Sequence, residues 1–586
     1  MITLKIHLKN INSRGGGKIG TIKHSQTPST ATLIPLKEKS VNWDNTENLY
    51  IEGDNEETLK LLQKTYFGKV NIIYIDPPYN TGHDFVYKDD FKNSIENYKK
   101  ITSQQSRANV DTSGRYHTDW LNMMFSRLLL ANNLLSKDGI ILISIDDNEV
   151  TNLRKICDEI FGENSFIAQI VWTNKEGGGG SDSKLFKIKH EYVLVYGKLI
   201  ENLELRGDEV DNEERYTETD QYVNTRGKHL LIRLESGSLG YIPSLDFPIE
   251  GPEGPILPNT DGRKVKRWRW SKPKVEWGLK NDYIVFKKGQ DGLWGVYTKQ
   301  YLNADNEGNI IKRTKTPNAL IDKYSTTQSA KELQKLFDGK IFDYPKPLDF
   351  IKYFINLIPS NDFMVLDFFS GSATTAHAVM QLNAEDNGKR KFIMVQLPEK
   401  CPENSEAYKR GYNTICDVGE ERIRRAEKQI YDELKEKYDN AGPLVNDYVN
   451  PDNLDFGFKV FKLESTNIKP WDGSTKVDES TILNLEDTIK EDRTNLDVAY
   501  EIMLKYGIFN MPLKEVQINN KTMYSIGEGY MIICLNNDIT LDDVSEIAKK
   551  KPNCIVFKEQ GFKDDNEKIN ATYTLERMGV EEVKCI

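Results

Sequence analysis

A carboxylate, two prolines and an aromatic residue stand directly after the apolar segment 70–75, in the order Asp76-Pro77-Pro78-Tyr79. The two prolines make a rigid turn whose backbone carbonyl groups cannot rotate away. A carboxylate and such a carbonyl can accept both hydrogens of an exocyclic amino group, adenine N6 for example, and stabilise the positive charge that develops when the nitrogen is methylated. Tyr79 can stack on a base that has swung out of a double helix. We therefore expect a catalytic site here; an ordinary strand end is the alternative.

A second segment of interest follows a predicted strand over 363–367 and reads Asp367-Phe368-Phe369-Ser370-Gly371-Ser372-Ala373-Thr374. Small residues let the backbone approach a ligand closely. The start of the helix predicted over 374–382 offers free N–H groups to a carboxylate or a phosphate. By itself the pattern fits both a ligand-binding loop and a plain turn between a strand and a helix.

Strand-like apolar runs alternate with helical spacing of apolar residues around both segments. Strands that alternate with helices predict a mostly parallel sheet covered on both faces, which is an α/β fold. The predicted strands are 49–51, 70–75, 139–145, 166–172, 191–196, 363–367 and 391–396, and the predicted helices are 58–66, 120–135, 148–161, 348–357, 374–382 and 409–437.

The alternating pattern breaks off between about 199 and 342, where turn signals and tryptophans accumulate. We expect an inserted module rich in β structure there and a small α/β domain near the C-terminus. The predicted organisation is a partly ordered leader over 1–40, a first, catalytic half of the α/β domain over 41–200, the insert over 201–340, a second half over 341–440 and a C-terminal domain over 441–586.

The composition narrows the class of protein. A chain of 586 residues with 38% hydrophobic residues is ordinary for a soluble protein of roughly two to four domains. It has no apolar stretch long enough to span a membrane and no apolar signal core, so we expect a cytoplasmic protein without a membrane partner. The six cysteines include no C-x-x-C pair, which favours reduced thiols over a zinc site, and we expect no metal.

Positive charge is concentrated within the predicted insert, although the net charge of the chain is −10. The segment 263–288 holds ten Lys or Arg and only two acids, with tryptophans interleaved. Such a segment suits contacts to phosphates and stacking on bases. A solvated hairpin with core tryptophans is the alternative. The residues expected to contact nucleic acid are Arg263, Lys264, Lys266, Arg267, Trp268, Arg269 and Trp270.

Together these motifs resemble those of a known family. The segment 74–82 resembles the catalytic motif of amino-methyltransferases, and 367–378 resembles their cofactor motif, in the circularly permuted order of the β class. The wider sequence is similar to the modification (Mod) subunit of type III restriction–modification systems. That similarity lies in Gly53-Asp54-Asn55, Trp120-Leu121-Asn122-Met123-Met124, Ile143-Ser144-Ile145-Asp146-Asp147, Lys189-His190-Glu191-Tyr192, Pro345-Lys346-Pro347-Leu348 and Glu421-Arg422-Ile423-Arg424-Arg425.

The resemblance implies a circularly permuted, Rossmann-like class I methyltransferase sheet, interrupted by a β-rich target-recognition domain and followed by a small α/β assembly domain. It also implies methyl transfer from S-adenosylmethionine to adenine N6 in duplex DNA by base flipping. Relatives that act on cytosine N4 more often carry Ser in place of Asp76. No Cys follows a Pro, which argues against cytosine C5 methylation by a thiolate. A homodimer and a helicase–nuclease (Res) partner are implied as well.

Individual positions take their expected functions from this resemblance. Asp76, Pro77, Pro78 and Tyr79 match the positions for the target base and catalysis. The residues matched to the cofactor are Asp54, Lys346, Pro347, Asp367, Phe368, Phe369, Ser370, Gly371, Ser372 and Thr374, with either Gln396 or Glu399 on the ribose. Ala373 stands where the family has a second glycine. Its methyl group fits if φ is negative, and cofactor affinity could otherwise be reduced.

Two other functions stay open. A stand-alone β-class methylase without a nuclease partner would share every motif, and a neighbouring helicase–nuclease gene would separate the two. A DNA-reading subunit with weakened cofactor binding is the alternative from a different class, and Ala373 and Gln396 are the residues that favour it. Measurements of cofactor binding and of methyl incorporation into adenine would distinguish an active methyltransferase from a subunit that only recognises DNA.

Overall fold

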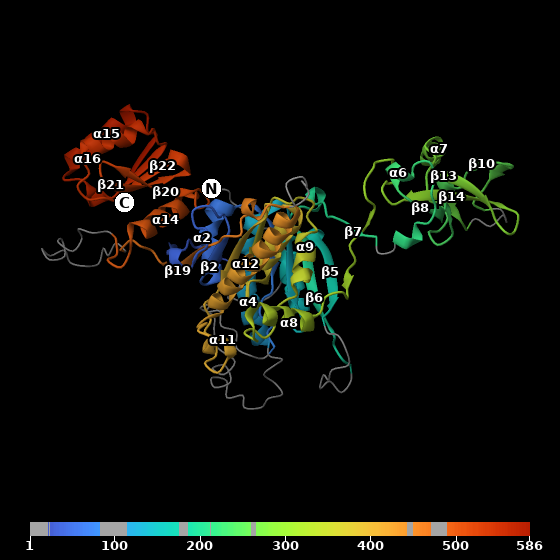
Figure 1. Ribbon diagram of the computed structural model, residues 1–586, viewed down its shortest axis with the longest axis horizontal. Coiled ribbons are helices and arrows are strands. Elements are labelled where there is room, and N and C mark those ends of the chain that lie inside the picture. Colours follow the sequence, from blue (N-terminus) through green and yellow to red (C-terminus); the bar gives the residue numbers. More distant parts are fainter. Residues whose placement is uncertain are drawn as a thin grey trace. The chain divides into compact units, whose positions relative to one another are not determined.

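The computed structural model describes residue 22 and residues 24–81, 114–174, 186–210, 213–259, 265–441, 449–469 and 489–586. Most of the expected leader, up to 21 and at 23, lies outside the described residues. The chain divides into two compact units, one formed by Met1–Leu205 with Ala319–Ile586 and the other by Arg206–Asn318 (Figure 1). The smaller unit falls within the range expected for the insert.

Among the described residues, the larger unit contains a ten-stranded sheet in the order β1-β19-β2-β18-β17-β3-β4-β6-β5-β16. The consecutive strands from β19 to β4 are parallel, as expected for strands that are joined through helices. The bounds are β1 (Ala31–Pro35), β2 (Leu49–Glu52), β3 (Val70–Ile75), β4 (Leu135–Ile145), β5 (Phe166–Thr173), β6 (His190–Gly197), β16 (Leu320–Ile321), β17 (Met364–Asp367), β18 (Lys391–Gln396) and β19 (Lys459–Ser465).

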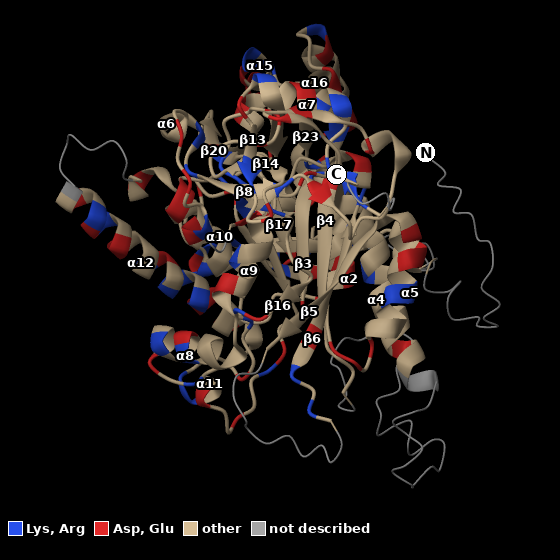
Figure 2. Ribbon diagram, turned by 90° about the vertical axis from the view of Figure 1, so that its right-hand side faces the viewer, with Lys and Arg blue, Asp and Glu red and all other residues tan. Residues whose placement is uncertain are grey.

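Helices cover both faces of this sheet, which explains why β3 and β17 are apolar at nearly every position (Figure 2). One face packs against α2 (Asn55–Tyr66), α4 (Gly114–Leu134) and α5 (Val150–Phe161). The other packs against α9 (Leu348–Ile355), α10 (Thr374–Asp386) and α12 (Ile415–Ala441), and α8 (Thr326–Phe337) contacts α12. The predicted mostly parallel α/β fold is confirmed.

The sheet brings the two motifs of the sequence together. β17 pairs in parallel with β3, through Val365↔Ile72 and Leu366↔Ile73. The order then runs from β3 to β4 on one side and from β17 to β18 on the other. Open α/β sheets bind ligands at the carboxyl ends of the strands where the order reverses in this way. Asp76 and Asp367 therefore lie at the edge where a ligand site is expected.

The C-terminal part contains a smaller sheet with helices. Its strands are β20 (Leu513–Ile518), β21 (Lys521–Ile526), β22 (Met531–Cys534), β23 (Cys554–Phe557) and β24 (Glu582–Cys585), in sequential order. The helices α15 (Leu541–Lys549) and α16 (Asp565–Arg577) connect its parallel strands, and α14 (Asn495–Tyr506) packs against β1 and α2. β19 lies within the range expected for the C-terminal domain but is a strand of the main sheet, next to β2.

The smaller unit is rich in short antiparallel pairs. β8 (His229–Arg233), β13 (Ile284–Lys288) and β14 (Trp294–Tyr301) form a three-stranded sheet, and α7 (Lys272–Lys280) packs against β13. The other elements are α6 (Val223–Arg226) and the pairs β7 (Asp208–Glu209) with β15 (Thr314–Lys315), β9 (Glu235–Ser236) with β12 (Arg267–Trp268), and β10 (Ile249–Gly251) with β11 (Gly254–Ile256). In neither unit does a helix of the described part combine the length and the apolar character needed to cross a membrane.

Candidate active site

Asp76 lies just beyond β3 at the carboxyl edge of the sheet, with 28% of its side chain exposed. Its Oδ1 accepts a hydrogen bond from the Tyr79 hydroxyl at 2.9 Å and lies 3.1 Å from the Lys346 ammonium. Burial raises the pKa of the Asp76 carboxyl, and the positive charge of Lys346 opposes this effect. A neighbouring cation thus replaces much of the water that would otherwise stabilise the carboxylate.

The turn after Asp76 leaves one of its two proline carbonyls free. The Pro78 carbonyl accepts a hydrogen bond from Trp120 Nε1 at 2.7 Å, whereas no described residue donates to the Pro77 carbonyl. Asn80 takes a positive φ of 55°, and its amide donates to the buried Glu149 at 2.5 Å, which fixes the end of the turn. The Pro77 carbonyl is therefore available to accept an amino hydrogen beside Asp76.

Four side chains form a polar quartet at this edge: Asp76, Tyr79, Glu191 and Lys346. Lys346 Nζ donates to the Tyr79 hydroxyl oxygen at 2.7 Å and to Glu191 Oε2 at 3.1 Å. The Tyr79 hydroxyl lies 3.0 Å from the same Glu191 oxygen. We did not expect Glu191, which β6 supplies, to be a site residue: its segment, Lys189-His190-Glu191-Tyr192, contributed to the family resemblance but carried no assigned function.

Lys346 stands next to the start of α9, where Pro347 is the N-cap residue. The resemblance matched both residues to the cofactor. The ammonium group lies in the polar quartet with the Asp76 carboxylate, and the Lys346 side chain is only 12% exposed. Attraction to Asp76 and Glu191 outweighs burial and raises the pKa of Lys346, so the group is a permanent cation at neutral pH.

Asp367 organises the loop that follows β17. Its Oδ2 accepts a hydrogen bond from the Thr375 hydroxyl at 2.6 Å, and its Oδ1 accepts one from the Phe369 N–H at 3.1 Å. Burial raises the pKa of Asp367 to about 7, and the negative charge of Asp76 contributes in the same direction. Both carboxylate oxygens therefore hold the cofactor loop 367–374 in shape.

This raised pKa predicts a pH-dependent stability. The folded protein holds the Asp367 proton more tightly than the unfolded chain, whose pKa is 3.8. The resulting stabilisation is complete below about pH 4 and is lost as the pH rises towards 7. The Asp367→Asn variant has no carboxyl group at this position, so its free energy of unfolding lacks this dependence on pH. Relative to the native protein, the variant should therefore gain stability as the pH rises from about 4 to about 7, by at most about 1.4 kcal/mol per pH unit. Thermal unfolding of both proteins between pH 4 and 8 measures the difference, and a difference that does not vary with pH contradicts it.

Ala373, which stands where the family has a glycine, adopts a left-handed backbone conformation. Its φ is 59° and its ψ is 40°, in the left-handed region, and the residue is fully buried. Gly371 also has a positive φ, of 51°. The loop turns into α10 at this point, and a glycine would adopt the conformation without steric cost. The condition under which the methyl group was expected to fit, a negative φ at Ala373, is therefore not met.

Ala373→Gly is expected to stabilise the protein by about 1 kcal/mol, because it relieves the left-handed conformation of an L residue. Ala376→Gly is the matched control: it lies in the same helix, is equally buried, and should instead destabilise by about 1 kcal/mol. Denaturant unfolding of the two variants checks the opposite signs. Destabilisation by both would show that Ala373 is not strained.

Two further residues support the cofactor loop from outside. The Gln396 side chain at the end of β18 accepts a hydrogen bond from the Gly371 N–H at 2.7 Å, and its amide nitrogen donates to the Leu397 carbonyl. The buried Arg422 of α12 donates to the hydroxyls of Ser372 and Thr374 at 2.9 and 2.6 Å. Arg422 stands in a segment of family resemblance, but sequence alone gave it no function. The Gln396 side chain is already engaged with the loop, whereas Glu399 is exposed.

Comparison with known proteins identifies the family. A model of a family described as DNA methylase matches residues 70–428, which is more than half of the chain. The chain belongs to the DNA methylase family. It is 34% identical to the type III restriction-modification enzyme StyLTI Mod subunit of Salmonella typhimurium, over 71% of this chain and 62% of that protein. It is 30% identical to the EcoPI Mod subunit of Escherichia phage P1, over 89% and 82% of the two chains. It is 33% identical to the type II methyltransferase M.KpnI of Klebsiella pneumoniae, over 64% and 86%.

The start of α2 is tied to the cofactor loop of this DNA methylase. Asp54 caps α2 by accepting hydrogen bonds from Glu56 and Glu57 N–H groups, and its side chain is 27% exposed. The Asn55 amide donates to the Phe368 carbonyl at 2.7 Å. The fully buried Arg127 holds Asp54 at 3.2 Å and Asn55 at 2.5 Å. Asp54 is thus held at the same sheet edge as the loop, with part of its carboxylate open.

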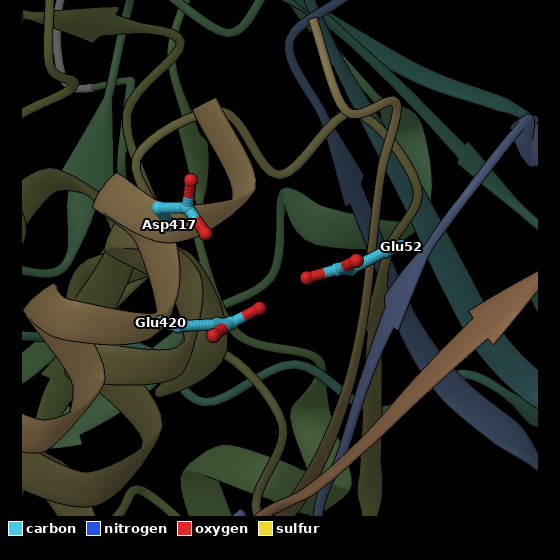
Figure 3. A group of neighbouring side chains, drawn as sticks. All are labelled: Glu52, Asp417 and Glu420. Atoms are coloured by element: carbon cyan, nitrogen blue, oxygen red, sulfur yellow. The ribbon is translucent and has the colours of Figure 1, made fainter. Parts of the chain in front are cut away.

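Glu52 at the end of β2 and two acids of α12, Asp417 and Glu420, turn their carboxylates toward one another (Figure 3). We call these three residues the acid cluster. The Lys39 ammonium lies among them, 2.5 Å from Glu52, 3.2 Å from Asp417 and 3.6 Å from Glu420. Burial and a hydrogen bond with Glu52 raise the pKa of Glu420 to about 8. A lysine of the chain itself therefore lies within this acid cluster and offsets part of its negative charge, and Arg424 pairs with Glu420 at 3.1 Å.

The basic segment of the methylase's smaller unit divides into surface and core residues. Arg263 and Lys264 lie outside the described residues. Lys266 and Arg269 are exposed, and Arg267 and Trp270 are half-buried. Trp268 is fully buried in a core with Leu234 and Val296, and its Nε1 donates to the Phe247 carbonyl at 2.7 Å. The expected stacking of Trp268 on a base is wrong, because exposing this ring would disrupt the core of the unit.

Proposed function

We propose that this DNA methylase transfers a methyl group from S-adenosylmethionine to adenine N6 in duplex DNA, as the modification subunit of a type III restriction–modification system. The observation that carries the proposal is the pairing of β3 with β17. It sets Asp76 and the free Pro77 carbonyl beside the cofactor loop 367–374. The two Mod subunits among the relatives support the type III assignment.

The residues at this edge fit S-adenosylmethionine. The Ser370 hydroxyl is buried and has no hydrogen-bond partner among the described residues, so a ligand atom can satisfy it. A Cβ at Gly371 would meet its nearest neighbour, Phe342, only at 3.7 Å, so that the loop backbone is open on that side. Asp54 and Glu399 provide carboxylates for the adenine amino group and the ribose hydroxyls, respectively, and Gln396 serves the ribose less well because it is engaged with Gly371.

When bound, the cofactor supplies a methyl group on a positively charged sulfur that leaves readily. The protein supplies acceptors and orientation. Asp76 and the Pro77 carbonyl accept hydrogen bonds from the two N6 hydrogens, which directs the nitrogen lone pair towards the methyl group and stabilises the positive charge that grows on N6. Once N6 carries the methyl group, Asp76 takes the surplus N6 proton and passes it to water. Tyr79 stacks on the flipped adenine, which requires its hydroxyl to release Asp76 and Glu191.

The smaller unit, Arg206–Asn318, is the target-recognition domain in this proposal. Arg269→Ala is expected to weaken binding to duplex DNA and to lower the salt dependence of binding by about one phosphate contact. Lys549→Ala on α15 is a control with an exposed cation outside this unit and should bind normally. Fluorescence anisotropy of labelled duplex DNA at several salt concentrations provides the measurement. Unchanged affinity and salt slope for Arg269→Ala would exclude this surface.

The proposal includes a homodimer, in which one subunit reads DNA while the other methylates, and a Res helicase–nuclease partner, acting on DNA in the cytoplasm at the nucleoid. A second candidate is a stand-alone methylase, which the similarity to the type II enzyme M.KpnI supports. A helicase–nuclease that co-purifies with the chain and cleaves DNA only in its presence would favour the type III assembly. A DNA-reading subunit without catalysis is the third candidate.

Methylation-sensitive sequencing of DNA from a host that expresses this chain alone tests the function. We expect N6-methyladenine on one strand of a short recurring sequence. Methyl groups on cytosine N4 would correct the target base. No methyl group in DNA that contains all short sequence contexts would refute the enzyme and leave the DNA-reading subunit.

A further inference from the structure

Glu191 belongs to the polar quartet but accepts no hydrogen from the target base in the proposed chemistry. β6 pairs it with Trp172 of β5 and leaves 19% of its side chain exposed. Its Oε1 accepts a hydrogen bond from the Asn174 amide at 2.5 Å. Its Oε2 faces Tyr79 and Lys346. The carboxylate is therefore fixed from behind and presented to the ammonium.

The Lys346 ammonium lies against Asp76 Oδ1, beside the place that the target amino group takes, while no described residue donates a hydrogen bond to Oδ2. Its three N–H donors are all used, on Asp76 at 3.1 Å, on Tyr79 at 2.7 Å and on Glu191 at 3.1 Å. The target amino group must donate to the same Asp76 carboxylate. Oδ2 is open to that hydrogen bond, but a cation on Oδ1 opposes the positive charge that forms on N6. Methyl transfer is therefore favoured when Lys346 has moved away from Asp76.

We propose that Glu191 is a positioning residue that draws the Lys346 ammonium away from Asp76, so that the charge of the ammonium no longer opposes the positive charge that forms on the target nitrogen. This inference rests on the proposed transfer to an exocyclic amino group. The movement is short because Lys346 already contacts Glu191. The rings of Tyr79 and Trp172 lie 5.0 and 5.5 Å from the ammonium and favour a cation within the site.

A second carboxylate is needed because the ammonium is buried. With 12% of its side chain exposed and the Trp172 ring 5.5 Å away, the Lys346 ammonium has little water to replace an anion that it leaves. Glu191 provides an acceptor inside the site, and Asn174 holds that acceptor in place. The lysine thus passes between two carboxylates without leaving the protein.

Three variants test this exchange: Glu191→Gln, Lys346→Met and the double variant. The rate of single-turnover methyl transfer is measured with saturating radiolabelled S-adenosylmethionine and unmethylated genomic DNA. Glu191→Gln should slow transfer by about tenfold, because Lys346 then stays on Asp76. Adding Lys346→Met to Glu191→Gln should restore most of this loss, because no cation remains to be moved. Tyr192→Phe, the next position on β6, is the control and should transfer at the native rate, since its hydroxyl contacts the exposed Asp147.

The pH profile separates this function from a purely structural one. The acid limb of the rate should move to lower pH in Glu191→Gln, because a negative charge that raises the pKa of Asp76 is lost while Lys346, which lowers it, stays close. It should move to higher pH in Lys346→Met, because the stabilising cation is lost. Both shifts are measured at saturating cofactor, so a weaker cofactor affinity does not mimic them.

The proposal is overturned if the double variant is no faster than Glu191→Gln, if Glu191→Gln transfers at the native rate, or if the acid limbs coincide. Failure of the proposed function gives a different result, since the native chain then transfers no methyl group to any DNA. Circular dichroism spectra that match the native protein show that a slow variant is folded.

Discussion

Replacing Asp76 by Ala should reduce the rate of methyl transfer by about a hundredfold to a thousandfold, because the target amino group loses the acceptor that directs its lone pair and stabilises its charge. Binding of S-adenosylmethionine should change little, because the cofactor loop is held by Asp367, Gln396 and Arg422 rather than by Asp76. Single-turnover incorporation of a labelled methyl group, together with calorimetric cofactor titration, measures both quantities.

Asp147→Ala is the matched control for Asp76→Ala. Asp147 follows β4, the strand next to β3, at the same edge of the sheet, but it is exposed and contacts only the Tyr192 hydroxyl among the described residues. Its removal should leave the rate within about twofold of the native value. An Asp76→Ala variant that transferred methyl groups at the native rate would show that the carboxylate is not catalytic.

Replacing Lys39 by Met should destabilise the protein by about 3 kcal/mol, because it leaves the acid cluster without its central cation. Glu52 and Glu420 are nearly buried, so water cannot take over the function of the ammonium. The loss should shrink as the pH falls, because protonation of Glu420, with its pKa of about 8, and then of the other acids removes the repulsion. Denaturant unfolding at pH 5 and pH 8 measures both effects.

Lys37→Met is the control for Lys39→Met. Lys37 lies two residues earlier, in the same short 3-10 helix (Lys37–Lys39), and is 44% exposed. Its ion pair with Glu515 is long, at 3.9 Å, so the removal of Lys37 should cost less than about 0.5 kcal/mol of stability. Equal losses in the two variants would show that the helix, and not the acid cluster, needs these lysines. Addition of divalent cations to Lys39→Met offers a second check. Without the lysine, the three converging carboxylates should bind such an ion, which should raise the free energy of unfolding of the variant.

The class of fold, and the two strand ends that we propose for the chemistry, could be predicted from the amino-acid sequence alone. Apolar runs and helical spacing act locally, so β3, β17 and their helices follow from short segments of chain. Asp76-Pro77-Pro78-Tyr79 and the loop after Asp367 could be recognised for the same reason, since a strand end, a proline turn and a run of small residues are written in consecutive positions. The family itself could be named from these motifs, and the match over 70–428 confirms it.

Which side chains meet depends on the tertiary structure. Glu191 and Lys346 come from elements far apart in the chain, and no pattern near either residue in sequence reveals that the Lys346 ammonium lies between the Asp76 and Glu191 carboxylates. Trp268 belonged to a basic, aromatic segment that suited DNA, but the smaller unit needs this ring to fill its core. Ala373 takes a positive φ because the turn into α10 demands it. The burial of a side chain, the pairing of distant strands and the conformation of a turn depend on the whole fold. A sequence pattern reports only on residues that are close together in the chain, so it cannot predict these features.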